Sequence, residues 1–172
     1  AEEQHHAAEP IPVGTTDISV EQVSFAYDGK KTVLNNIHLT IRSGTLNAFV
    51  GASGSGKSTL ARLIAGYWDV QDGSIRIGGH DLKDIPLPQL YDLVSFVAQD
   101  TYLFDDTIRE NIRLGKPSAR DTQVERAAEM AGCAAFIRRL AHGYDTRVGS
   151  GGSHLSGGER QRIAIARAML KD

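Results

Sequence analysis

Residues 51–59 read GASGSGKST, and their glycines, hydroxyls and lysine are residue types that hold phosphate groups. Gly51, Gly56, Lys57 and Ser58 fit the pattern G-x-x-x-x-G-K-S/T of a phosphate-binding loop. Glycines let successive backbone N–H groups point into one concavity, and a following helix N-terminus adds to the attraction for anions. The residues predicted to contact nucleotide here are Gly51, Ser53, Gly54, Ser55, Gly56, Lys57, Ser58 and Thr59.

Two side chains of this loop have distinct expected roles. Lys57 is expected to place a positive charge at the β and γ phosphates, and the Ser58 hydroxyl offers a hard oxygen ligand for Mg²⁺. A glycine-rich turn that matches the pattern by accident is the alternative, and a preceding strand with a following helix makes it less favoured. The loop alone does not choose among kinases, GTPases and motor ATPases.

A second candidate phosphate site lies well downstream, in the stretch LSGGERQR at residues 155–162. Ser156 is a potential helix N-cap, and Gly157 and Gly158 leave the first turn open, so that N–H groups and the positive end of the helix dipole can meet an anion. A bare Ser-Gly-Gly is more often an ordinary capped helix start. Following a phosphate-binding loop, and with Glu159 next in sequence, the stretch favours a second phosphate contact.

Hydrophobic periodicity indicates the elements that must position these residues. Alternation predicts two half-buried antiparallel strands, and a short apolar run predicts a strand buried on both faces that leads into the glycine loop. The predicted strands are residues 18–25, 37–41, 46–50, 74–77 and 93–97, and the predicted helices are residues 59–68, 107–114 and 122–140.

Composition narrows the classes of function. The 172 residues are 41% hydrophobic and 23% charged, which is typical of a globular domain, and the net charge of -2 gives no basic field for nucleic acid. We therefore expect no nucleic-acid partner. Cys133 is the single cysteine and is expected to be a small buried thiol. Residues 1–16 are expected to be a linker, in which His5 and His6 are solvated.

These motifs together resemble the nucleotide-binding domain of ATP-binding cassette (ABC) transporters, over residues 17–172. LSGGE is similar to the family signature, VSFAYDG puts Tyr27 at the family's adenine-stacking aromatic, and SFVAQDTYLF puts Gln99 at the glutamine that reaches Mg²⁺ and the attacking water. The resemblance implies an α/β P-loop NTPase fold with a parallel core sheet and an N-terminal antiparallel β subdomain. It also implies a mostly helical subdomain at residues 101–154 and a signature motif and helix at residues 155–172.

The resemblance further implies how the site works. ATP and Mg²⁺ would bind in a head-to-tail dimer between the loop of one copy and the signature helix of another, with Ser156, Gly157, Gly158 and Glu159 at the nucleotide. The implied catalytic residues are Lys57, Gln99 and Ser156, and the implied metal ligands are Ser58 and Gln99. A second nucleotide-binding domain, identical or different, and the transmembrane domains would be the partners.

FDDTIRENI and YDTRVGSGGSHLSGGERQR are similar to exporter-type transporters, in which membrane helices precede this domain in one polypeptide. Residues 1–16 would then connect to the last membrane helix, at the cytoplasmic face of a bacterial inner membrane. Two positions depart from the pattern: Ala98 replaces a common proline, and Ser150 replaces the glutamate thought to contact the membrane domain.

In the family, a segment like ARAMLKD is followed by a strand that carries the catalytic carboxylates. A catalytic histidine lies further along the chain. The 172 residues lack this strand, so we expect the domain to be truncated before it and the segment alone to hydrolyse ATP negligibly. Asp105 and Asp106 have no reason to substitute. Two alternatives remain: a nucleotide-binding or regulatory module without ATPase activity, and a soluble tandem-cassette ATPase.

Overall fold

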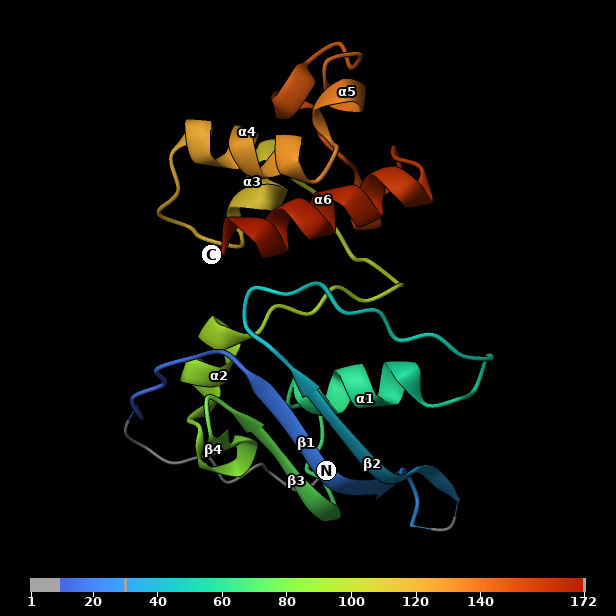
Figure 1. Ribbon diagram of the computed structural model, residues 1–172. Coiled ribbons are helices and arrows are strands. Elements are labelled where there is room, and N and C mark those ends of the chain that lie inside the picture. The colour runs from blue at the N-terminus through green and yellow to red at the C-terminus, as the bar shows by residue number, and fades with distance from the viewer. Residues whose placement is uncertain (1–9, 30, 172) are drawn as a thin grey trace. The chain divides into compact units, whose positions relative to one another are not determined.

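The computed structural model describes residues 10–29 and 31–171. It divides into two compact units, Ala1–Val94 and Ser95–Asp172, called here the first and second units. Each has its own hydrophobic core and its own arrangement of elements (Figure 1).

An antiparallel sheet organises the first unit. Its strands are β1 (Ile18–Ala26), β2 (Thr32–Ile41), β3 (Asp72–Ile77) and β4 (His80–Asp81), in the order β2-β1-β3-β4. Within it, Val20 of β1 lies opposite Leu39 of β2 on one side and Ile75 of β3 on the other. The predicted antiparallel start and the predicted strand at residues 74–77 are therefore confirmed.

A bulge in β1 explains its uneven hydrophobic pattern. The pairing register shifts between Val20 and Val23, and Gln22 has a positive φ of 51°. An extra residue at this point lets Val20 and Val23 both face the core although three positions separate them. Gly73 approaches the bulge so closely that a Cβ on it would lie 2.3 Å from the carbonyl oxygen of Glu21.

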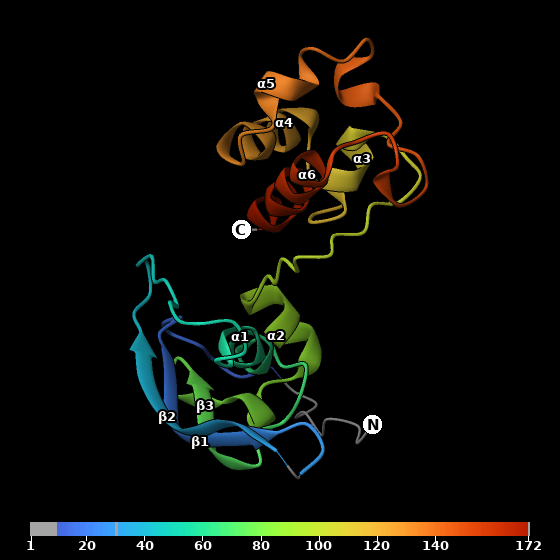
Figure 2. The same ribbon diagram turned by 90° about the vertical axis from the view of Figure 1, so that its right-hand side faces the viewer.

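Two helices lie on one face of this sheet (Figure 2). They are α1 (Lys57–Ile64) and α2 (Leu87–Leu93), and a short 3-10 helix, η1 (Leu82–Asp84), lies between β4 and α2 in the chain. Leu60, Leu63 and Ile64 of α1 are buried in the core with residues of all three long strands. The predicted helix at residues 59–68 is thus present, shifted toward the glycine loop.

Two predicted strands are wrong. Residues 46–50 are irregular, with Leu46 101% and Val50 90% exposed, and residues 93–97 begin at the last residue of α2 and continue as irregular chain. A parallel strand needs hydrogen-bonding neighbours, and every strand pair within residues 10–29 and 31–171 is antiparallel. The parallel core sheet expected from the resemblance is therefore not formed by the described residues.

The described part of the predicted linker packs against the first unit. The side chain of Gln89 accepts a hydrogen bond from the Ile11 N–H at 2.9 Å and donates one to the Ile11 carbonyl at 2.6 Å. Ile11 and Val13 also pack on the core cluster. Gln89 mimics a peptide group in this pairing, which holds residues 10–16 to the unit. His5 and His6 lie outside the described residues.

The second unit is helical. Its helices are α3 (Ile108–Arg113), α4 (Asp121–Met130), α5 (Ala134–Ile137) and α6 (Gly157–Leu170), with short 3-10 helices η2 (Gly143–Asp145) and η3 (Ser150–Gly152). Helix α6 packs against α3 and α4. The predicted helix at residues 107–114 is confirmed. The single helix predicted at residues 122–140 is wrong, because Gly132 adopts a φ of 71° and ends α4 before α5 begins.

Asn111 is a buried polar centre of the second unit. Its side chain donates to the carbonyls of Phe104 and Thr107 and accepts from the Phe104 N–H, all within 2.9–3.0 Å. The Arg167 guanidinium of α6 donates to the Asn111 carbonyl and side-chain oxygen. One amide therefore joins the chain before α3, α3 itself and α6.

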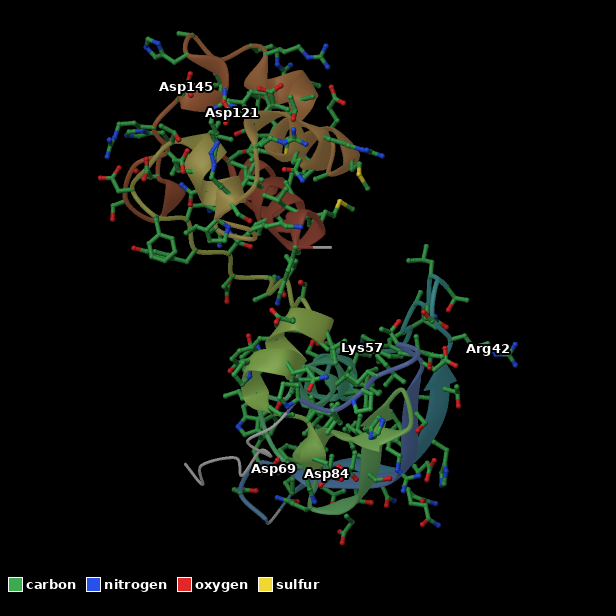
Figure 3. All side chains as sticks on the ribbon, turned by 90° about the vertical axis from the view of Figure 1, so that its left-hand side faces the viewer. Arg42, Lys57, Asp69, Asp84, Asp121 and Asp145 are labelled. Carbon is green, nitrogen blue, oxygen red and sulfur yellow. The ribbon has the colours of Figure 1, made fainter. Side chains whose placement is uncertain are left out.

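Arg109 of α3 ties the surface of the second unit together. Its guanidinium lies 3.2 Å from carboxylate oxygens of Asp121, Glu125 and Asp145, and 5.2 Å from the centre of the Tyr144 ring. Figure 3 labels Asp121 and Asp145, which lie close together in this unit. The contacts fix the loop that carries η2 to α3 and α4.

Along the described chain, none of the helices has the length and apolar character needed to cross a bilayer.

Candidate functional site

The glycine loop has a backbone that only glycine adopts easily. Gly54 and Gly56 have φ values of 81° and 87°, and Gly56 is the N-cap of α1. A Cβ on Gly56 would also lie 2.6 Å from the Leu34 side chain of β2. The close approach of loop and strand fixes where α1 begins, so the N–H groups of its first turn face the loop.

Lys57 closes the concavity of this loop. Its Nζ donates to the carbonyls of Gly51 at 2.9 Å and Ala52 at 2.8 Å, and to the hydroxyl of Ser55 at 3.1 Å. Figure 3 shows Lys57 in the first unit. The hollow holds about 240 Å³ and is lined by Val33 and by residues 53–59. An ammonium group beside a hollow of backbone N–H groups suits a polyphosphate.

The hydroxyls after Lys57 differ in environment. Ser58 is exposed and lines the hollow, so its oxygen fits the predicted role of a Mg²⁺ ligand. Thr59 is buried, and its hydroxyl shares a hydrogen bond of 2.9 Å with the Tyr27 hydroxyl. Tyr27 is thereby brought to the first turn of α1, although it lies far from the loop in sequence.

An aromatic cluster surrounds Tyr27. Its ring meets Phe25 edge-on at 5.2 Å and Trp68 edge-on at 5.0 Å, while half of the tyrosine stays exposed. An exposed face of this kind can stack on a planar base. Sequence reasoning missed Trp68, which follows the end of α1. The spacing Phe25-x-Tyr27 across the end of β1 was the available signal for the first two rings.

Ser156 is the N-cap of α6, as predicted, and it forms a capping box with Glu159. Glu159 Oε2 accepts hydrogen bonds from the Ser156 N–H at 2.9 Å and from the Ser156 hydroxyl at 2.8 Å. These bonds to the charged form lower the pKa of Glu159, chiefly through the Ser156 backbone N–H.

The open first turn predicted for α6 is thus only partly open. Gly157 and Gly158 are exposed, and their N–H groups precede the first intrahelical donor, so both can meet an anion. The Ser156 N–H and hydroxyl, however, are engaged by the Glu159 carboxylate of the same chain. The capping box, readable in the sequence as Ser-x-x-Glu, was the signal for this.

Gln99 is exposed and lies in irregular chain at the start of the second unit, whereas Ser58 belongs to the first unit. The joint metal role of Gln99 and Ser58 therefore stays a prediction. Ala98 accepts a hydrogen bond of 3.2 Å from the Thr101 hydroxyl, so the alanine carbonyl stabilises the turn after Gln99. Ser150 is exposed at the start of η3.

Comparison with known proteins decides the family. A family model described as "ABC transporter" matches residues 34–172, which is well over half of the chain. The chain belongs to the ABC transporter family. It is an ATP-binding domain of the exporter type, and this confirms the resemblance inferred from the two phosphate motifs.

Named relatives support the exporter subtype. A putative multidrug export ATP-binding/permease protein of Staphylococcus aureus is 46% identical over 96% of this chain and 29% of its own length. An uncharacterized ABC transporter ATP-binding protein of Sinorhizobium fredii is 43% identical over 98% of this chain and 29% of its own. A bacterial Atm1-family ABC exporter with ATP bound matches with a TM-score of 0.91 at 39% identity, over 97% of this chain and 30% of that chain.

The ABC chain described here thus spans less than a third of the length of these relatives. ABC ATPases bind ATP, and the hollow beside Lys57 has the size and donors for its phosphates.

Proposed function

We propose that this ABC domain is part of a motor that binds and hydrolyses ATP to move a solute across a membrane. The observation that carries the proposal is the Lys57 ammonium held over the glycine hollow, in a chain that belongs to the ABC transporter family. The family explains why such a loop would serve a motor rather than a kinase or a GTPase.

In this proposal each residue has one task. Lys57 leaves its loop carbonyls to neutralise charge on the β and γ phosphates, and the N–H groups at the start of α1 bind the remaining oxygens. Bound Mg²⁺ would neutralise further phosphate charge, held by the exposed Ser58 hydroxyl and by Gln99. Tyr27 presents its exposed ring face to adenine.

The proposed working form is a head-to-tail dimer, identical or mixed, with transmembrane domains attached. The loop of one copy and the Ser156 end of α6 in another would enclose one ATP, so that binding favours the closed dimer and hydrolysis removes that preference. Support comes from the relatives, whose names describe ATP-binding/permease and exporter proteins. Such an assembly would lie on the cytoplasmic face of a membrane, such as a bacterial inner membrane.

Residues 1–172 alone are proposed to bind ATP without measurable turnover. The hollow is lined by Val33 and by glycines, hydroxyls and Lys57, and no carboxylate is among these lining residues. A general base or a second metal-holding carboxylate near the γ phosphate would therefore have to come from elsewhere. Gln99 can orient water but cannot accept its proton at neutral pH.

Trp68 provides the test, because it is the single tryptophan and lies 5.0 Å from the Tyr27 ring. ATP is titrated into residues 1–172 with Mg²⁺ while tryptophan emission and phosphate release are followed. We expect saturable binding that Lys57→Ala weakens roughly ten- to a hundredfold, since a charge-assisted contact is lost. Lys83→Ala, at an exposed lysine of η1, is the matched control and should bind normally.

Phosphate release separates the alternatives. Turnover by residues 1–172 that Lys57→Ala abolishes would contradict the proposed inactivity of the segment. If a longer chain with the membrane domain also binds ATP without turnover, the domain is a regulatory module. Failure to bind ATP at all would overturn the proposal. The exporter-type relatives disfavour a soluble tandem-cassette ATPase.

A further inference from the structure

The donors of Ser156 can serve only one acceptor at a time. The backbone N–H and the hydroxyl each carry one hydrogen, and both are directed at Glu159 Oε2, at 2.9 Å and 2.8 Å. The Glu159 N–H in turn approaches the Ser156 hydroxyl oxygen at 3.4 Å. The single hydrogen of the hydroxyl is therefore committed within the capping box.

A phosphate oxygen bound by the Ser156 side chain would need the hydroxyl hydrogen that Glu159 now accepts. It would also be placed beside the Glu159 carboxylate, which already occupies the positive end of the α6 dipole. Two anions cannot share one hydroxyl hydrogen, and their charges repel. Donation of the Ser156 hydroxyl to Glu159 and its donation to a phosphate are consequently exclusive states.

We propose that Glu159 is an internal competitor for the γ phosphate, which occupies Ser156 until nucleotide displaces it and so weakens closure of the ATP-bound dimer. This inference rests on the proposed function, because it assigns the Ser156 end of α6 to a nucleotide held by a second copy. The nucleotide can bind only to copies in which Ser156 is not self-capped. Its apparent affinity is therefore the intrinsic affinity multiplied by the fraction of such copies.

Two arginines near Glu159 favour its negative charge. Arg162, one turn further along α6, and Arg139, after α5, both favour its charged form electrostatically. Arg160 is held elsewhere, because its Nη1 donates to the Leu155 carbonyl at 2.6 Å. The charge of Glu159 is therefore stabilised by these two arginines as well as by its hydrogen bonds to Ser156.

Glu159→Gln tests the proposal without removing the cap. Glutamine also completes a capping box, but a neutral amide competes less strongly than a carboxylate, whose hydrogen bonds are about twice as strong. In the full-length transporter and in residues 1–172, ATP-dependent association of the ATP-binding domains is measured by sedimentation and by cysteine cross-linking. We expect Glu159→Gln to lower the ATP concentration for half-maximal association by roughly three- to tenfold.

Glu110→Gln is the matched control. Glu110 also lies three residues after a helix N-cap, Thr107 of α3. The substitution therefore removes one negative charge at the same helical position, but on a helix that does not carry Ser156. It should leave the association unchanged. Ser156 and Gly157 amide NMR signals provide a second readout: inorganic phosphate should shift them at lower concentrations in Glu159→Gln than in the unaltered protein.

The outcomes distinguish failure of this inference from failure of the proposed function on which it rests. If ATP-dependent association occurs, is lost in Lys57→Ala and is unchanged or weaker in Glu159→Gln, competition by Glu159 is wrong while the proposed function stands. If ATP binds but no variant associates, the composite site is wrong and the competition falls with it. Equal effects of Glu159→Gln and Glu110→Gln would indicate general charge repulsion and also overturn the proposal.

Discussion

At the scale of single residues, Tyr27 combines two functions that can be separated. Its hydroxyl is joined to Thr59 at the first turn of α1, while its ring is supported edge-on by Phe25 and Trp68. The hydroxyl therefore positions the ring relative to the phosphate loop, and the exposed ring face is left for the base. Removing one function need not remove the other.

We predict that Tyr27→Ala weakens ATP binding roughly tenfold, because stacking of a base on an aromatic ring is lost. Tyr27→Phe keeps the ring and should weaken binding by less than about threefold, the cost of one neutral hydrogen bond. Calorimetric titration with ATP checks both values. Inorganic triphosphate, which has no base, should bind all three proteins alike; a loss there too would show that Tyr27 acts by shaping the loop. Tyr91→Ala, at another exposed tyrosine, is the control.

Residue types and spacing predicted the phosphate loop and the α6 cap well, because both follow from local rules of glycine conformation and helix capping. They did not reveal that Glu159 engages Ser156, although the Ser-x-x-Glu pattern contains the information. The pairing of Tyr27 with Thr59 depends on how β1 packs beside α1, and no local pattern in the sequence encodes that contact.

At the scale of elements, the FDDTIRENI stretch is held together by one buried amide. Asn111 is completely buried and satisfies backbone groups of Phe104 and Thr107 while binding the Arg167 guanidinium. The partners of Asn111 include backbone groups in partly buried surroundings. The amide is therefore a structural requirement of the second unit rather than a nucleotide contact.

We predict that Asn111→Ala lowers the free energy of unfolding of the second unit by about 2–4 kcal/mol, because several partly buried polar groups lose their partner at once and a fully buried side chain is truncated. Urea denaturation followed by circular dichroism measures the change. Asn35→Ala, at an exposed position of β2, should change it by less than about 0.5 kcal/mol. A comparable loss in both variants would contradict the assigned role of Asn111.

Helices and strands were predicted correctly where the hydrophobic periodicity of a single segment determines them. A strand was predicted wrongly where pairing with another segment determines whether it forms. Alternation located β1 and β2, since each buries one face within the same sheet. Residues 46–50 look like a buried strand, yet a strand forms only with neighbours, and the described residues provide none for it. The helix predicted at residues 122–140 failed for a local reason, the left-handed conformation of Gly132.

At the scale of the whole molecule, the two units have separate cores. One is built on the sheet with α1 and α2, and the other on α3 to α6. The family and its α/β class were predictable, because the two phosphate motifs specify them. The shared metal role of Gln99 and Ser58 stays a prediction, because these residues belong to different units.

The core of the second unit also contains a residue that reports on its opening. Cys133, the single cysteine, is buried in the second unit, where desolvation raises the pKa of its thiol to about 11. The thiolate, which is the form that reacts, is therefore scarce at neutral pH. We predict that a thiol reagent modifies Cys133 only at the rate at which the second unit opens, and that Asn111→Ala speeds this reaction; rapid modification of the folded protein would contradict it.

The low reactivity of the Cys133 thiol has a practical consequence for spectroscopy. A cysteine introduced at an exposed position such as Ser150 can be labelled selectively with a fluorophore while Cys133 is left in place. Trp68 in the first unit and such a dye in the second form a donor and acceptor pair built on a nearly native sequence. Energy transfer between them would follow the separation of the two units as nucleotide is added, in solution and in real time.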